Sequence, residues 1–385
     1  MLRFLTAGES HGPCLTAIVE GLPAGLAVDV EAINRDLARR QGGYGRGGRM
    51  KIEKDEAEIL GGVLLGKTTG APVALRIENR DWPNWRERWA GGNLPRLSVP
   101  RPGHADYAGM VKYGLDDARL VLERASARET AARVAVGALA KQLLAAFDVA
   151  VGSCVAEIGG VIAEIPDLPP EELWALAEAS DVRCPDPEAA ARMCAAIDAA
   201  RQAGDSLGGV FVVTAAGALV GLGSYVHWDR RLDARLAAAV MSIPAVKGVE
   251  IGPAFENARK PGTRVHDAFV RGSEKANQPV TRATNRAGGI EGGMSNGQPI
   301  VVRAAMKPIP TTITPQRSVD LATGEPAETQ YQRSDVCAAP AAAVVGEAMV
   351  AWVLAEALIE KLGGDSLKEM LLRDALNDEN VVRRA

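Results

Sequence analysis

The stretch SARETAARVAVGALAKQLLAAF (residues 126–147) is the most regular in the sequence, and it decides the class of fold. Alanine, valine and leucine recur in it at helical spacing, and Ser126 and Glu129 form a capping-box pattern at its start. The pattern predicts a long helix. The backbone N–H groups at the beginning of such a helix are a natural site for an anion.

The segments around this helix alternate between strand and helix patterns. Strand patterns occupy residues 13–20, 59–77 (a hairpin broken by the glycines of residues 66–70), 149–161, 209–216, 246–251 and 299–306. Helix patterns occupy residues 31–40, 171–181, 187–203, 231–242 and 339–362. No fixed repeat and no polar linker interrupts this order. We therefore expect one α+β domain over residues 1–385, with a short tail after about residue 366.

Residues 80–103 fit neither period, because tryptophans and prolines are scattered through them. The segment predicts a long ordered loop. Loops of this length inside a compact domain are often functional.

Composition excludes several classes of protein. The formal net charge of −4 argues against general nucleic-acid binding, and the N-terminus shows no secretory signal pattern. The apolar residues 338–358 contain Pro340, Glu347 and Glu356, which a membrane-spanning helix rarely carries near its middle. The five cysteines show no metal-binding spacing. We expect a cytoplasmic protein that is not associated with membranes, has reduced thiols and holds no metal.

Arginine is concentrated in one glycine-rich segment. Arg39, Arg40, Arg46 and Arg49 fall within eleven residues that also hold five glycines, at positions 42, 43, 45, 47 and 48. Guanidinium groups and bare backbone amides can together bind phosphate or carboxylate oxygens. The segment therefore predicts a local anion site.

The motif Gly-Glu-Ser-His-Gly (residues 8–12) matches the nucleophile elbow of serine hydrolases. An elbow, however, follows several sheet strands and leads into a helix, whereas only seven residues precede this motif and a strand pattern follows it. Serine hydrolysis is therefore an alternative with little support.

Two of the four histidines stand out from the others. His11 lies in the glycine motif, and His104 lies in Arg-Pro-Gly-His-Ala-Asp (residues 101–106), beside an arginine and an aspartate. A lone loop histidine is more often structural than catalytic, but these two both sit in glycine turns next to anion-binding residues. We treat them as candidates for proton transfer.

Two further motifs remain ambiguous at the level of residues alone. Arg124 and Arg128 bracket the start of the long helix, which a well-capped surface helix would also explain. Arg-Ser-Asp (residues 333–335) precedes the C-terminal helix pattern, where Asp335 is either a helix cap or a functional group.

Together these motifs resemble the signatures of chorismate synthase, in the order and spacing of that family. The matching segments are residues 8–12, 39–47, 101–106, 124–130, 288–297 and 333–335. The resemblance extends from residue 1 to about residue 366. It implies a sandwich in which helices lie between β-sheets, and a homotetramer.

The resemblance also implies a reaction: 1,4-elimination of phosphate and a proton from 5-enolpyruvylshikimate-3-phosphate, which gives chorismate for aromatic amino acid biosynthesis. Reduced FMN assists such an elimination without net redox change, either NADPH or a separate flavin reductase supplying its electrons. The alternatives are an FMN-dependent oxidoreductase that consumes NADPH, and a non-catalytic protein that binds phosphate or nucleotides.

Residue roles follow from the resemblance by position. The catalytic residues would be His11, His104 and Asp335, with Asp335 near flavin N5. The substrate-binding residues would be Ser10, Arg40, Arg46, Arg101 and Arg128, and Arg40 and Arg46 are linked to NADPH in some relatives. The FMN-binding residues would be Arg124, Ala125, Ser126, Pro244, Ala245, Gly292, Lys307, Pro308, Ile309, Pro310, Thr311 and Arg333.

Overall fold

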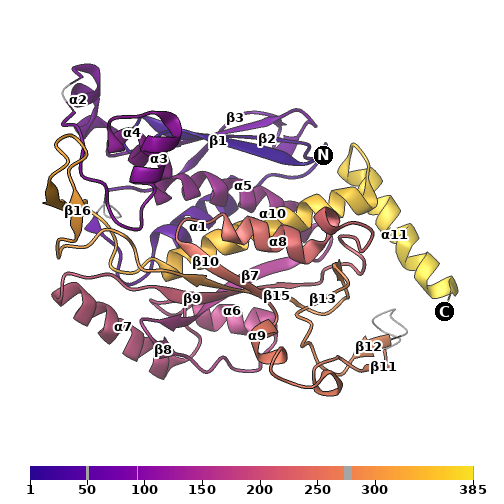
Figure 1. Ribbon diagram of the computed structural model, residues 1–385. Coiled ribbons are helices and arrows are strands. Elements are labelled where there is room, and N and C mark those ends of the chain that lie inside the picture. Colours follow the sequence, from indigo (N-terminus) through magenta and orange to yellow (C-terminus); the bar gives the residue numbers. More distant parts are fainter. Residues whose placement is uncertain (49–51, 93, 273–279, 385) are drawn as a thin grey trace.

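The structure is a computed structural model that describes residues 1–48, 52–92, 94–272 and 280–384, the last eight of these by their backbone alone. The chain forms a four-stranded sheet and a five-stranded sheet. Figure 1 shows a layer of helices between them. The predicted α+β sandwich with internal helices is confirmed.

The first sheet contains β1 (Arg3–Ala7), β2 (Cys14–Glu20), β6 (Val73–Glu78) and β3 (Ala57–Gly61), in the order β1-β2-β6-β3. All its pairings are antiparallel. Alternate residues of β2 and β6, such as Leu15 and Leu75, are buried against the helices, which explains the alternating sequence pattern. The short hairpin of β4 (Val63–Leu64) and β5 (Lys67–Thr68) connects β3 to β6.

The second sheet contains β10 (Val246–Ile251), β15 (Ile300–Met306), β9 (Gly209–Ala216), β7 (Ala150–Ile158) and β8 (Val161–Ile162), in that order. It is also antiparallel throughout. Phe211 and Val213 of β9 are fully buried and contribute to the core that both sheets share.

The central layer consists of α1 (Val30–Gln41), α5 (Thr130–Ala145), α8 (Leu232–Met241) and α10 (Ala339–Leu362). Helix α5 packs on β2 and β6, and α10 packs on β7 and β9, so each sheet has its own helix. These two helices cross closely at Gly137. A Cβ atom there would lie 2.3 Å from the Cβ of Ala348, so only glycine allows this approach.

Helix α10 is buried on nearly all sides. In the part of the chain that the structure describes, it alone has the length and apolar composition of a membrane span, and 89% of its most apolar window is buried inside the protein. It begins at Ala339 with Pro340 in its first turn and ends at Leu362 with Gly363 as its C-cap, as the sequence predicts.

The remaining elements cover the outer surfaces. Helices α6 (Pro170–Glu178) and α7 (Pro187–Gln202) contact β7, and α9 (Ala254–Asn257) contacts β10. The long segment before α5 contains η2 (Trp82–Asn84), α2 (Arg86–Ala90), α3 (Asp106–Tyr113), α4 (Ala118–Ala125) and η3 (Ala127–Glu129). Smaller elements are η4 (Trp228–Arg230), η5 (Gly262–Arg264), β11 (Phe269–Arg271), β12 (Val280–Arg282), β13 (Ile290–Glu291), β14 (Met294–Ser295), β16 (Arg317–Val319) and β17 (Pro326–Glu328).

Two local predictions need correction. Residues 80–103 are not purely irregular, because η2 and α2 lie within them. The Ser126 hydroxyl caps η3 rather than α5, and the Glu129 carboxylate bonds Thr6 and Arg133 instead of closing a capping box. The tail expected after about residue 366 contains the helix α11 (Leu367–Arg384), which projects from the body in Figure 1.

Candidate active site

His11 lies in the turn that joins β1 to β2, and the side chain of Glu123 holds it from α4. One Glu123 oxygen accepts the backbone N–H of His11 at 2.8 Å, and the other lies 2.9 Å from the imidazole Nδ1. Trp85 packs on the imidazole, with 4.0 Å between the ring centroids. The ring is therefore fixed in orientation, and Nε2 is the ring nitrogen that Glu123 does not contact.

Ser10 precedes this histidine and is 2% exposed. Its hydroxyl lies 3.1 Å from that of Ser126, so two predicted site residues meet here. The strands on both sides of the turn pair with each other, which is a strand–turn–strand arrangement. A nucleophile elbow requires a strand–turn–helix arrangement, so the serine hydrolase alternative fails on geometry.

Asn79 connects this turn to the buried Arg128. Its side-chain amide donates to the carbonyls of Glu9 and Gly12, and its oxygen accepts from Arg128. One buried amide thus connects the His11 turn to a predicted substrate-binding arginine.

His104 stands in a comparable pair with Asp106, at the start of α3. Nδ1 lies 2.5 Å from the Asp106 carboxylate and 2.9 Å from Nη2 of Arg101. A carboxylate only accepts and a guanidinium only donates, so we place the proton on Nδ1 on the basis of the shorter contact, to Asp106. Arg101 grips the same carboxylate with Nε at 2.8 Å and Nη2 at 3.0 Å. Burial alone would raise the pKa of the Asp106 carboxyl, but His104 and Arg101 outweigh it and hold that pKa well below its usual range.

The predicted FMN loop of residues 307–311 lies against this His104 turn. Thr311 accepts from Arg101 at 3.2 Å, and the Lys307 ammonium donates to the carbonyl of Gly103. The backbone N–H of Lys307 donates to Ala245, and Ser206 donates to the carbonyl of Ile309. Ala245, half-buried beside Pro244, has a φ of 68°, a conformation that residues other than glycine rarely adopt.

Arg40 and Arg128 are both buried and meet at one carboxylate, that of Asp55. Arg128 binds Asp55 at 2.6 and 2.7 Å, and Arg40 reaches it at 3.5 Å. Arg40 also donates to Thr130 and to the carbonyl of Ala127. Burial lowers the pKa of the Arg40 guanidinium, and Asp55 offsets this only partly because Arg128 and Arg46 add like charge.

Asp335 is not the cap of α10, so the helix-cap interpretation is wrong. The N-cap position is Ala338, and the helix has no side-chain cap. The Asp335 carboxylate instead accepts from the backbone N–H of Gly47 and from Arg46, both at 2.6 Å. A Cβ atom on Gly47 would lie 2.5 Å from the carbonyl oxygen of Ser334, so this close approach requires glycine.

Arg333 connects this region back to the His11 turn. It donates to the buried Asp81 at 2.9 Å, and the same Asp81 oxygen accepts from the indole of Trp85. In the other direction, the hydroxyl of Ser334 donates to the carbonyl of Thr311. The contacts thus link the two histidine turns through the loops of residues 307–311 and 333–335.

The remaining predicted residues are less closely joined to this network. Arg124 donates to Thr6, and Ala125 ends α4 beside Ser126. Gly292 lies in the turn between β13 and β14, which Figure 1 draws on the opposite side of the molecule from α2, α4 and β16. Arg49 lies outside the described residues.

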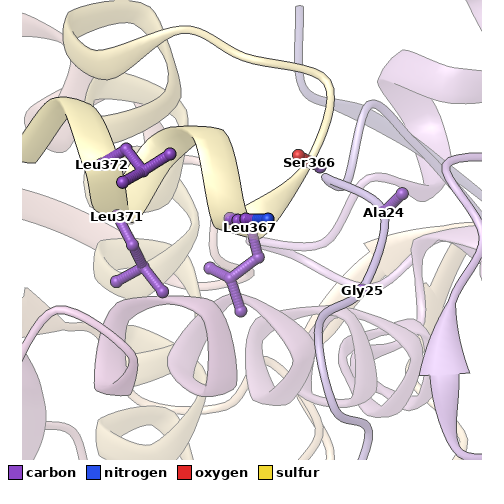
Figure 2. A pocket seen from close by; sticks show the side chains of 7 residues that line it. Ala24, Gly25, Ser366, Leu367, Leu371 and Leu372 are labelled. Atoms are coloured by element: carbon purple, nitrogen blue, oxygen red, sulfur yellow. The ribbon is translucent and has the colours of Figure 1, made fainter.

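One groove formed by described residues lies away from this chemistry. It has a volume of about 660 Å³ and runs between α11 and the loop after β2. Figure 2 shows its leucine side chains, Leu367, Leu371 and Leu372, beside Ala24 and Gly25. None of the predicted site residues lines this groove. In the described part of the chain, no group of three or more His, Cys, Asp or Glu side chains is placed to hold a metal.

Sequence reasoning missed the acidic and aromatic residues that hold the predicted ones in place. Glu123, Asp55 and Asp81 are each less than 9% exposed, and each binds a predicted site residue or Trp85. Their sequence signal is weak, because acidic residues are usually solvated. Only the concentration of tryptophans in residues 80–103 indicated that a residue such as Trp85 has a role in the site.

Comparisons with known proteins agree with this geometry. The chorismate synthase family model matches residues 2–359. A chorismate synthase of Geobacter sulfurreducens is 58% identical over 379 residues, and one of Chlorobaculum tepidum is 56% identical over 383, each alignment covering 96% of both chains. A solved structure described as "Crystal Structure of Chorismate Synthase" superposes with a TM-score of 0.80 at 45% identity, over 99% of this chain and 98% of that one. The chain therefore belongs to the chorismate synthase family of lyases.

Proposed function

We propose that the chain removes phosphate and a proton from 5-enolpyruvylshikimate-3-phosphate to give chorismate, assisted by reduced FMN and without net redox change. The observation that carries this proposal is the pair of histidines, each held at Nδ1 by a carboxylate and linked to the other through arginine-bearing loops. An elimination needs proton transfer near neutral pH and compensation of negative charge, which imidazoles and guanidiniums provide.

His11 and His104 would take part in proton transfer through Nε2, because Nδ1 of each faces a carboxylate. Arg46 and Arg101, each 10% exposed at the side chain, would bind the carboxylates and phosphate of the substrate together with Ser10. Arg40 and Arg128 are buried deeper, and an incoming anion would compete with Asp55 for them. We propose that they act on the substrate mainly through their charge.

The residues proposed for FMN suit an anionic flavin nucleotide. Arg124 and Arg333 are each 47% exposed at the side chain and are able to reach an anionic group, while Ser126 and Thr311 offer hydroxyls. Gly292 lies away from these residues in Figure 1, so its place in the FMN set stays a prediction from the family resemblance. Lys307, Pro308, Ile309, Pro310, Pro244, Ala245 and Ala125 would complete the set through backbone and apolar contacts. When bound, reduced FMN supplies electron density transiently and regains it, so it is not consumed.

Several finer expectations belong to the same proposal. Asp335 would serve as a proton acceptor near the flavin, held beside Arg46. NADPH, at Arg40 and Arg46, or a separate reductase would supply the reducing equivalents. The protein would work in the cytoplasm as a homotetramer.

One assay tests the proposal. The protein is incubated anaerobically with 5-enolpyruvylshikimate-3-phosphate, FMN and dithionite, and chorismate absorbance and free phosphate are followed. We expect equal amounts of both products and no reaction without reduced flavin. Oxidation of FMN or NADPH in step with product would favour an oxidoreductase, and the absence of turnover would favour a binding protein.

A further inference from the structure

We infer that Glu123 is a positioning residue that sets the protonation pattern and orientation of His11. The inference deepens the proposed function and rests on it for its kinetic consequence. Its structural basis is that both carboxylate oxygens of Glu123 contact His11, one at the backbone N–H and the other at Nδ1.

The contacts determine which nitrogen of the imidazole carries a proton. A backbone N–H can only donate, so the Glu123 oxygen 2.8 Å from the His11 nitrogen is an acceptor. The second oxygen, 2.9 Å from Nδ1, is also an acceptor, which requires a proton on Nδ1. The neutral ring is therefore unprotonated at Nε2, and a proton is gained or lost there while the Nδ1 contact stays intact.

Burial makes this arrangement rigid. The side chains of Glu123 and His11 are 5% and 17% exposed, so little water competes for the contact. The carbonyl of Glu123 also accepts the backbone N–H of Ser10, and Trp85 packs on the imidazole. Glu123 thus holds two consecutive residues of the turn from one position on α4.

Other charged groups on the packed elements are less direct. Arg88 of α2 and Arg119 of α4 lie 5.7 and 5.9 Å from the centre of the Trp85 ring. Glu9 lies in the same turn, next to Gly12. In the pair of His104 and Asp106, by contrast, the carboxylate is shared with Arg101. Glu123 is therefore the more specific partner of its histidine.

Replacing Glu123 by Gln gives a sharp test, because an amide has one acceptor and one donor end. The backbone N–H of His11 cannot change, so the amide oxygen must face it and the NH₂ group must face Nδ1. That arrangement removes the proton from Nδ1, moves it to Nε2 and disfavours the imidazolium. Glu123→Asp keeps a carboxylate and should retain the Nδ1 proton.

The measurement is nitrogen NMR of protein carrying ¹⁵N only in histidine, with His11 assigned through a His11→Ala sample. We expect Nδ1–H and an unprotonated Nε2 in the wild type at pH 8, and the reverse in Glu123→Gln. Turnover should fall roughly 10²-fold with KM nearly unchanged, and the alkaline limb of the pH–rate profile should move down by about one pH unit. Glu123→Asp should recover part of the turnover.

Glu347→Gln is the matched control, since Glu347 is another buried carboxylate, whose hydrogen bonds run to Arg39, Lys141, Ser153 and Arg183. It should lower stability and leave the His11 tautomer as in the wild type. A wild-type His11 protonated at Nε2, or an unchanged tautomer in Glu123→Gln, would overturn the inference. Failure to form chorismate would refute the proposed function instead, while the NMR result would still decide the role of Glu123.

Discussion

Arg39 and Arg40 are neighbours in the last turn of α1, yet they enter two different buried clusters of charge. Arg39 binds Glu347 of α10, and Arg40 reaches Asp55, beside Arg128. Consecutive helical residues point about 100° apart, so one helix end serves both the core and the candidate site.

The two clusters differ in the direction in which the surroundings shift the pKa of the arginine from α1. Burial alone would raise the pKa of the Glu347 carboxyl, but Lys141, Arg39 and Arg183 outweigh it and hold that pKa well below its usual range. Burial alone would lower the pKa of Arg39, but Glu347, Glu178 and Asp36 raise it. The pKa of Arg40, by contrast, is lowered. The surroundings of Arg39 favour its charge and those of Arg40 disfavour it, so an added anion would help only the second cluster.

The largest expected effect is on the first cluster. Glu347→Ala should lower the free energy of unfolding by about 3–5 kcal/mol, because it leaves buried cations without their shared carboxylate. Chemical denaturation measures this. Glu360 lies on the same helix as Glu347 and forms a half-exposed pair with Arg235 of α8; Glu360→Ala should cost less than about 1 kcal/mol. Equal losses in the two variants would show that Glu347 is no more important than a surface pair.

Asp335→Asn should lower turnover roughly 10²-fold, equivalent to about 2.7 kcal/mol, while melting temperature and FMN binding stay close to wild type. The amide can accept from Gly47 but can neither take up a proton nor pair with Arg46. Steady-state kinetics and a thermal melt measure the two effects. Full turnover in this variant would leave Asp335 as a tether of the glycine-rich loop only.

Asp55→Asn should destabilise the protein by about 2 kcal/mol, because Arg40 and Arg128 lose the carboxylate between them. Added sulfate should raise the melting temperature of this variant more than that of the wild type, since it replaces the missing negative charge. Equal responses to sulfate would contradict the view that this cluster has room for an anion.

The matched variants Arg39→Lys and Arg40→Lys test the comparison directly. Each should cost about 1 kcal/mol of stability, because lysine cannot reproduce the several directed hydrogen bonds of arginine. We expect Arg40→Lys alone to reduce turnover, by about tenfold. Similar kinetics in the two variants would remove the functional distinction between the clusters.

The last effect concerns the stability of the protein in acid. The pKa of Glu347 is below its ordinary value of 4.5 in the folded protein, so its stabilising contribution is complete above that pH and is lost as pH falls toward the folded-state pKa. The stability gap between wild type and Glu347→Gln should therefore narrow below about pH 4.5, by up to about 1.4 kcal/mol per pH unit. Denaturation at pH 7, 5, 4 and 3 measures it, and a constant gap would exclude Glu347 as the source.

Much of the fold could be predicted because its elements carry strong local patterns. The strands of β9 and β10 and the helix α10 begin and end at the predicted residues. The capping box at Ser126 was wrong because Glu129 has a better partner in Arg133, one turn further along α5. Sheet order could not be predicted, because pairing between distant strands depends on contacts that leave no local pattern.

Of the candidate site, the sequence indicated the histidines and arginines but not their partners. The role of Asp335 was left open between a cap and a functional group, and the structure excludes the cap because Ala338 occupies the N-cap position while Asp335 bonds Gly47 and Arg46. Glu123, 112 residues from His11 in the chain, carries no sequence sign of their contact. Long-range partners of this kind require the folded structure.

The position of α10 in the chain has a consequence for folding during synthesis of the protein. Helix α10 is the last in the chain of the four helices between the two sheets, so β7 and β9, on which it packs, leave the ribosome before it does. The apolar inner face of the second sheet stays partly uncovered and prone to aggregation until residues 339–362 emerge. Translation that stops before α10 should therefore yield a truncated chain that aggregates, rather than a smaller folded protein.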